Sequence, residues 1–121
     1  MSTSAAPRMR RAAAREVRVH SGDAARLLRA LANPQRLEIL CTLAEGEMSV
    51  SELNQRVDLS QSALSQHLAV LRAEGIVGTR REAQTICYSM HPGPAARVMA
   101  ALHDIFCGPA SRHAARARRT R

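Results

Sequence analysis

The sequence predicts a mainly α-helical domain that carries one small β-hairpin. Apolar residues recur at three- and four-residue spacing along most of the middle of the chain, which indicates amphipathic helices. Over residues 76–90 the apolar spacing changes to two, which indicates a pair of strands. At 121 residues and 45% hydrophobic, the chain is long enough for one packed core. We therefore expect one domain over residues 21–107, between a flexible arm at 1–20 and a flexible tail at 108–121.

The arginines are concentrated at the two ends of the chain. Residues 1–20 hold five Arg and one Glu, and residues 108–121 hold five Arg and no acidic residue, so their net charges are +4 and +5. The segment between them carries −1 of the total of +8. This distribution indicates a polyanionic partner whose phosphates both ends can contact, although two solvated tails would have the same composition.

Composition argues against several other classes of protein. No apolar run approaches the ~18 residues of a membrane-spanning helix, and the first residues lack the apolar core of a secretory signal. Three cysteines without framework spacing fit a reducing compartment, so we expect a cytoplasmic protein without a membrane partner. Tyr88 and Phe106 are its aromatic residues, which is too few for a surface that stacks on unpaired bases.

The first two helices of the domain begin at recognisable signals. A helix is expected from Ser21, with these residues on one face: Ala24, Leu27, Leu28 and Leu31. Asn33 and Pro34 have the types preferred at an N-cap and at the first helical position, so a second helix follows. Its apolar face is expected to hold Leu37, Leu40, Cys41 and Ala44.

Two helices joined by a tight turn follow. Ser49 and Glu52 have the spacing of a capping box, which starts a short helix. Ser60 caps a longer helix, which ends at Gly75. The inner face of the longer helix carries Leu64, Leu68 and Leu71. Two helices joined by the three-residue turn 58–60 are typical of a helix-turn-helix.

A hairpin with a charged end comes next. Residues 76–79 and 86–90 are apolar or β-branched and predict two strands, and residues 80–85 between them are polar. A last amphipathic helix is expected from about Ala95 to Cys107. The order of elements, four helices, two strands and one helix, is that of a winged helix-turn-helix, in which the hairpin is the wing.

The longer helix of the pair has the polar face that DNA recognition requires. The major groove admits one helix, which contacts base edges with side chains near its N-terminal end. Any one of these polar residues alone fits a solvated helix surface, but together with a basic wing they favour double-stranded DNA. The expected DNA-contacting residues are Gln61, Ser62, Ser65, Gln66, His67, Arg80, Arg81 and Gln84.

Three segments resemble the ArsR/SmtB family of winged-helix repressors. They are residues 31–40 (LANPQRLEIL), 59–71 (LSQSALSQHLAVL) and 75–77 (GIV). The resemblance covers roughly residues 21–107. It implies a homodimer, held by the first and last helices, that binds an inverted-repeat operator and leaves it when an inducer binds. The wing departs from the frequent family pattern because Glu82, Ala83 and Gln84 stand where a tip glycine is common.

Most members of that family sense metal ions, and two of their recurrent sites can be compared with this chain. Residues 48–52 lack the Cys-x-Cys pair of one site, and the start of the last helix lacks the zinc ligands of the other. Only His103, Asp104 and His113 remain, without a set of partners. We expect no metal and no cofactor, with a site of Cys41, Cys107 and His103 as the alternative.

Cys41 and Cys107 resemble the thiol pair of the BigR/SqrR-type branch, which is close to the HlyU type. That branch senses reactive sulfur species, and the resemblance implies that the two thiols lie near each other and become joined by a sulfur bridge. The expected function is a repressor, not an enzyme, released from DNA by persulfide or polysulfide. The alternatives are a metal-responsive regulator, a general oxidant sensor and a small thiol oxidoreductase, which the missing Cys-x-x-Cys disfavours. Cys87 is expected to pack within its strand.

Overall fold

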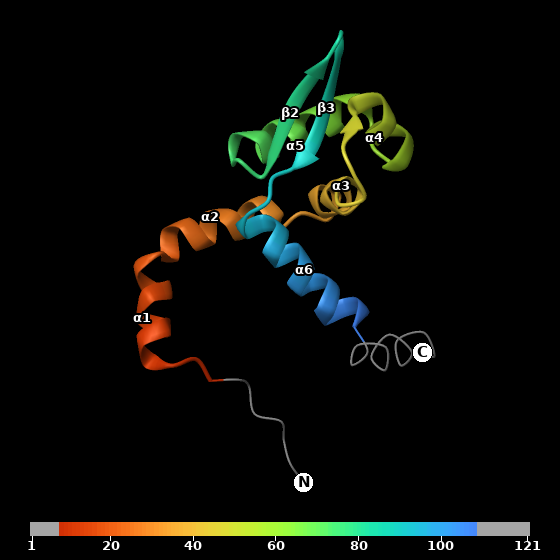
Figure 1. Cartoon of the computed structure of the whole chain (residues 1–121). Coiled ribbons are helices and arrows are strands. Elements are labelled where there is room, and N and C mark those ends of the chain that lie inside the picture. The colour runs from red at the N-terminus through yellow and green to blue at the C-terminus, as the bar shows by residue number, and fades with distance from the viewer. Residues whose placement is uncertain (1–7, 109–121) are drawn as a thin grey trace, which may run out of the picture.

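The computed structural model describes residues 8–108, and within that range the chain forms helices and a small sheet that lies at one end of the molecule (Figure 1). The helices are α1 (Arg11–Val19), α2 (Ser21–Leu31), α3 (Pro34–Leu43), α4 (Val50–Arg56), α5 (Gln61–Ala73) and α6 (Pro94–Cys107). The strands are β1 (Met48–Ser49), β2 (Val77–Glu82) and β3 (Thr85–Met90). The fold is the expected winged helix-turn-helix, in which α4 and α5 form the pair and β2 and β3 form the wing.

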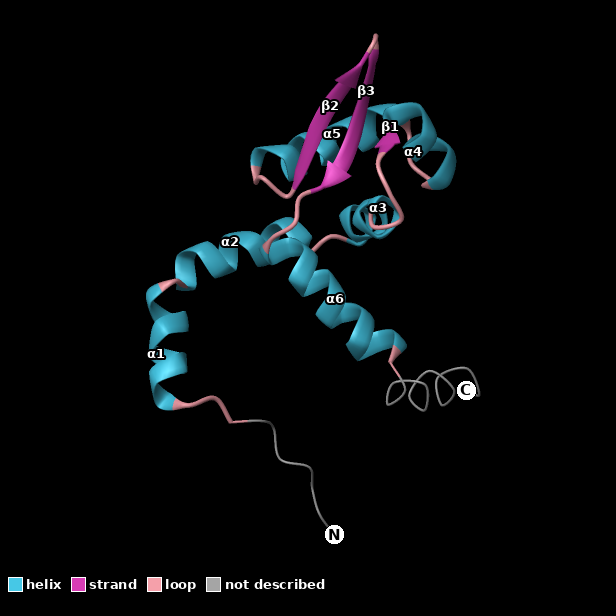
Figure 2. Ribbon diagram, in the orientation of Figure 1, coloured by secondary structure: helices cyan, strands magenta, loops and turns pink. Residues whose placement is uncertain are grey.

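The strands form one antiparallel sheet in the order β1-β3-β2 (Figure 2). The short strand β1 was not expected from the sequence, and the wing strands reach further into the charged segment than its composition indicated. Glu82 pairs with Thr85, so a two-residue turn closes the wing. Ala83 has a φ of 57° in this turn. A side chain is disfavoured in that region, so the wing closes without a glycine at the cost of local strain.

The core lies between the helix-turn-helix, the sheet and α3. Its largest fully buried side chains are Ile39, Leu40, Leu53, Leu64, Leu68, Leu71 and Val77. The three leucines predicted on the inner face of α5 are among them, at most 1% exposed. Their burial fixes which face of α5 points outward, because residues three and four apart share one face of a helix.

The predicted helix caps are present. Oδ1 of Asn33 accepts hydrogen bonds from the backbone N–H groups of Gln35 and Arg36 at the start of α3. Ser49 and Glu52 form the complete capping box of α4, and the Ser60 hydroxyl accepts from the N–H of Ala63 in α5. These bonds satisfy donors that the first turn of a helix otherwise leaves unpaired.

Two expectations about the helices were wrong. No helix was expected before Ser21, but α1 occupies Arg11–Val19, because Ala and Arg favour helix even where no residue is buried. Cys41 was expected on the apolar face of α3, but its side chain is exposed. The buried face of α3 instead holds Ile39, Leu40, Thr42 and Leu43. Residues 109–121, which include nearly all of the expected tail, lie outside the described residues.

Candidate nucleic-acid interface and thiol positions

The first two turns of α5 present an uncharged polar face to solvent. Four of the expected DNA-contacting residues are exposed there: Gln61, Ser62, Ser65 and Gln66. They lie opposite the buried leucines, and no acidic residue occurs within α5. A face of this kind can enter a major groove and form hydrogen bonds to base edges.

His67, which was expected beside this face as a DNA-contacting residue, makes contacts within the protein. Its ring is half-buried, and its Nε2 lies 2.8 Å from Oε1 of Gln35. Its Nδ1 lies 3.5 Å from Nη1 of Arg36. Because the guanidinium only donates and the amide oxygen only accepts, the neutral ring with hydrogen on Nε2 satisfies both neighbours. His67 therefore joins α5 to the first turn of α3.

Arg36 extends this connection to α2. Its Nε donates to the carbonyl of Ala30 at 2.6 Å, and its Nη2 donates to the carbonyl of Arg29 at 3.1 Å. These carbonyls belong to the last turn of α2, where a helix leaves its acceptors unpaired and favours a cation. One guanidinium thus fixes α2, α3 and α5 relative to one another.

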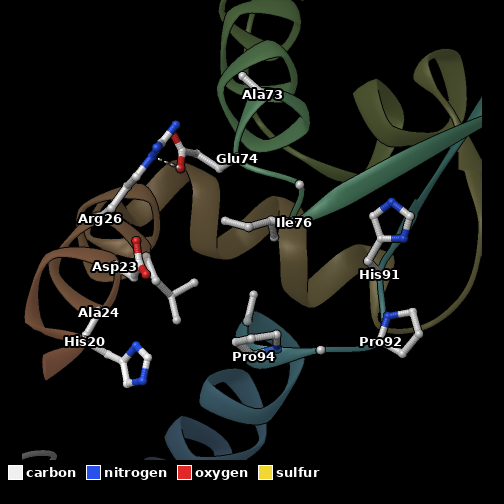
Figure 3. Close-up of a pocket in the computed structure, with 14 residues that line it drawn as sticks. His20, Asp23, Ala24, Arg26, Ala73, Glu74, Ile76, His91, Pro92 and Pro94 are labelled. Carbon is white, nitrogen blue, oxygen red and sulfur yellow. Dashed lines mark hydrogen bonds and ion pairs between the residues drawn. The ribbon is translucent and has the colours of Figure 1, made fainter. Parts of the chain in front are cut away.

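The C-terminal end of α5 is also attached to α2. Nε of Arg26 lies 2.7 Å from Oε1 of Glu74, the residue that ends α5. The pair borders a hollow of about 680 Å³, where α2, the end of α5 and the start of α6 meet (Figure 3). The helix with the polar face is therefore connected to α3 near its middle, through His67, and to α2 at its C-terminal end, through Glu74.

The wing arginines differ from each other. Nη2 of Arg80 lies 2.6 Å from Oε1 of Glu47 and 2.9 Å from Oε2 of Glu82. These hydrogen bonds hold the pKa of Glu47 below its ordinary value and raise the pKa of Arg80. Arg81 is exposed and has no ion pair with any residue between 8 and 108. Arg81 is thus the freer of the two guanidinium groups, and the exposed Gln84 lies in the turn at the tip of the wing.

The structure adds two residues to this surface. A hollow of about 440 Å³ lies between α5 and β3 and is lined by Ser65, Ala69, Arg72, Ala73 and Tyr88. Arg72 lies two turns after Ser65 on the same face of α5. A helical projection extended to the C-terminal half of this helix would therefore have identified Arg72. Tyr88 belongs to β3, and only the tertiary fold brings it to this helix.

The three thiols are free. Cys41 lies in α3 and Cys107 is the last residue of α6, and both side chains are exposed. Cys87 is half-buried in β3, the central strand of the sheet. Cys41 follows Gln35 by six residues of one helix, a rise of about 9 Å. Cys41 and the contact between α3 and α5 therefore lie on one helix, less than two turns apart.

The described residues contain no cluster of three or more His, Cys, Asp or Glu side chains able to hold a metal ion. Nδ1 of His103 lies 3.8 Å from Oδ1 of Asp104, and both side chains are exposed. His113 lies outside the described residues. Between residues 8 and 108, no helix is long and apolar enough to cross a bilayer.

A buried three-leucine face, an outward polar face and a charged hairpin beside them define a winged-helix DNA-binding protein. The model of the bacterial regulatory protein family arsR matches residues 33–79, from the start of α3 into the wing. Together with the relatives below, this match shows that the chain belongs to the arsR family. It is a DNA-binding transcriptional regulator, not an enzyme.

The relatives cover most of the described fold. The transcriptional activator HlyU of Vibrio cholerae is 49% identical over 92 residues, which are 76% of this chain and 85% of the relative. The biofilm growth-associated repressor of Agrobacterium fabrum is 53% identical over 87 residues, 72% of this chain and 74% of the relative. The crystal structure of the repressor BigR from Xylella fastidiosa matches with a TM-score of 0.72 at 44% identity, covering 77% of this chain and 95% of that one.

Proposed function

We propose that this protein is a homodimeric repressor that leaves an inverted-repeat operator when reactive sulfur species modify Cys41 and Cys107. The observation that carries the proposal is the exposed Cys41 on α3, the helix whose first turn holds His67 of α5. A covalent change on α3 thus has a short path to the DNA-contacting helix. The similarity to biofilm growth-associated repressors supports repression as the direction of control.

The chemistry requires two thiolates and a polysulfide. The Cys41 thiolate attacks an internal sulfur atom, forms a Cys41–S–S–SH group and releases a shorter hydropolysulfide. The Cys107 thiolate then attacks the sulfur atom next to Sγ of Cys41, and hydrosulfide leaves. The two thiols lose two electrons, which the polysulfide accepts, and the cysteines are joined through an additional sulfur atom. Exposure of both side chains allows the first attack at either thiol.

The bridge acts on DNA binding through the position of α5. Joining α3 to the end of α6 favours one arrangement of these helices over another, and allostery requires such a difference between two states. The hydrogen bonds of Arg36 and His67 and the Arg26–Glu74 ion pair transmit a shift of α2 and α3 to α5. Two α5 helices about 34 Å apart fit successive turns of one DNA face, so a small shift in each protomer weakens both contacts.

Exposed apolar residues on α2 and α6 support the dimer. Leu28 is 55% exposed, Ile105 is 59% exposed and Phe106 is 58% exposed. Large apolar side chains at this exposure are typical of a surface that a partner covers. A two-fold contact through α2 and α6 buries these residues and leaves the outward face of α5 free.

Mass spectrometry of the full chain after treatment with inorganic polysulfide tests the proposal. The expected product has Cys41 and Cys107 joined with one or more added sulfur atoms, while Cys87 remains a free thiol. A Cys87→Ser variant is the matched control and should give the same bridge. Unmodified Cys41 and Cys107 after treatment contradict the proposal, as does a stoichiometric metal ion that changes DNA affinity while polysulfide does not.

A further inference from the structure

The net positive charge of this chain lies outside the domain that contacts the operator. Residues 21–107 carry eight arginines against nine acidic residues. In the wing, Arg80 is paired with both Glu47 and Glu82, which reduces the positive charge there further. Phosphate neutralisation supplies a large share of the affinity of proteins for DNA. The arginines near the chain ends are therefore candidates for phosphate contacts outside this domain.

The helix α1 presents a stripe of free guanidinium groups. Arg11, Arg15 and Arg18 follow one another at spacings of four and three, so they share one face of the helix. All three side chains are exposed, and none forms an ion pair with a described residue. Arg8 and Arg10, just before the helix, are exposed and unpaired in the same way.

This stripe disfavours the helix that carries it. Like charges at spacings of three and four repel each other, and Glu16 is the one acidic residue of α1. Arg26, Arg56 and Arg80 each have a carboxylate partner, whereas none of the three arginines of the stripe has one among residues 8–108. A regularly spaced polyanion would remove the repulsion within α1, and a nucleic acid backbone has that character.

The stripe lies far from the DNA-contacting surface of its own subunit. Figure 1 shows α1 and the C-terminal end of α6 at one end of the molecule, with the tip of the wing at the other. The sequence after α6 holds five more arginines, which lie outside the described residues. An operator held by α5 and the wing therefore leaves the stripe on α1 open to a different anion.

We propose that the arginine stripe of α1 binds the phosphate backbone of a second DNA segment, without sequence preference, while α5 and the wing hold the operator. One regulator bound at its operator then holds a neighbouring stretch of the same DNA or another duplex. The proposal needs only the DNA binding of the family and is independent of the thiols.

A two-duplex capture experiment tests this proposal with the full-length protein. The operator is first obtained by selection from random duplexes, immobilised and saturated with protein. A labelled duplex of scrambled sequence is then added, and the retained label is measured at increasing salt. The test variant is Arg15→Gln/Arg18→Gln. The matched control is Arg29→Gln/Arg97→Gln, which removes the same charge from exposed, unpaired arginines of α2 and α6.

Wild type and control should retain the scrambled duplex, and the α1 variant should retain at least about tenfold less, with a salt slope smaller by about 2. Circular dichroism should show the same helix content in all three proteins. Absence of capture by wild type overturns the proposal, as does an equal loss in the control. If the α1 variant loses operator binding to the same extent, the stripe contacts the operator itself, and the proposal is also overturned. Failure of the selection step would instead count against operator binding.

Discussion

Nε2 of His67 lies 2.8 Å from Oε1 of Gln35, which joins α5 to the first turn of α3. Because α3 also carries the exposed Cys41, this bond connects the candidate sensing helix to the candidate DNA-contacting helix. Arg36 contacts the opposite ring nitrogen and the end of α2.

A double-mutant cycle of Gln35→Ala and His67→Ala should show that the two side chains act together. Each substitution alone should weaken operator binding about fivefold, because a hydrogen bond contributes about 1 kcal/mol to holding α5 in place. The double variant should be no weaker than either single variant. The measurement is operator affinity by fluorescence anisotropy at fixed salt. Additive losses would mean that His67 contacts DNA directly.

The local features of this fold were predictable from sequence, and the long-range ones were not. The caps at Asn33, Ser49 and Ser60 depend on residues two or three positions apart, so their spacing showed them. The inner leucines of α5 were predictable because the helical repeat sets its buried face.

The contact that His67 makes within the protein could not be predicted from residue spacing. His67 falls on the polar side of α5 in a helical projection, yet its partner Gln35 lies 32 residues earlier. Arg80 was expected to contact DNA, and its ion pair was not foreseen: the unexpected β1 places the preceding Glu47 beside β3, where it forms an ion pair with Arg80. Both differences come from contacts made only when distant segments pack.

Arg36→Ala should destabilise the fold by about 2 kcal/mol. The substitution removes the hydrogen bonds that the charged guanidinium donates to the carbonyls of Arg29 and Ala30. These carbonyls, in the last turn of α2, then lack these hydrogen-bond donors. Urea unfolding followed by circular dichroism measures the change. Arg97→Ala, an exposed arginine without an ion pair among the described residues, is the control and should change stability by less than about 0.5 kcal/mol. Equal losses in the two variants would contradict the role assigned to Arg36.

Glu47→Gln should tighten DNA binding and steepen its salt dependence. The change removes a carboxylate from Arg80 and leaves that guanidinium freer to contact a phosphate. Arg80 lowers the pKa of Glu47, so the stabilising pair forms fully above the ordinary carboxyl pKa and is lost only as pH falls through the lowered value.

The affinity difference between wild type and Glu47→Gln should therefore stay constant from about pH 6 to 8, far above the range in which Glu47 titrates. Anisotropy titrations over that range and at several salt concentrations measure it. Asp104→Asn on α6 makes the same change in net charge away from the wing and should have a smaller effect. An equal effect of Asp104→Asn would show that overall charge, not release of Arg80, is responsible.

Ile105→Glu should convert the protein to a monomer. The substitution places a charge within the exposed apolar residues of α6, where dimer formation would bury it. Sedimentation velocity reports the mass in solution. Ile86→Glu is the matched control, because Ile86 is also exposed, at 40%, but lies in the wing. If the Ile105→Glu protein is still a dimer, the end of α6 is not part of the dimer interface.

Operator affinity of the Cys41→Ser protein before and after inorganic polysulfide is the most direct test of the proposed regulation. The account predicts that polysulfide lowers the affinity of wild type and of Cys87→Ser at least about tenfold, a coupling of about 1.4 kcal/mol. Cys41→Ser should bind the operator as tightly as untreated wild type and stay bound after treatment. A Cys41→Ser protein that polysulfide still releases from DNA would contradict the account.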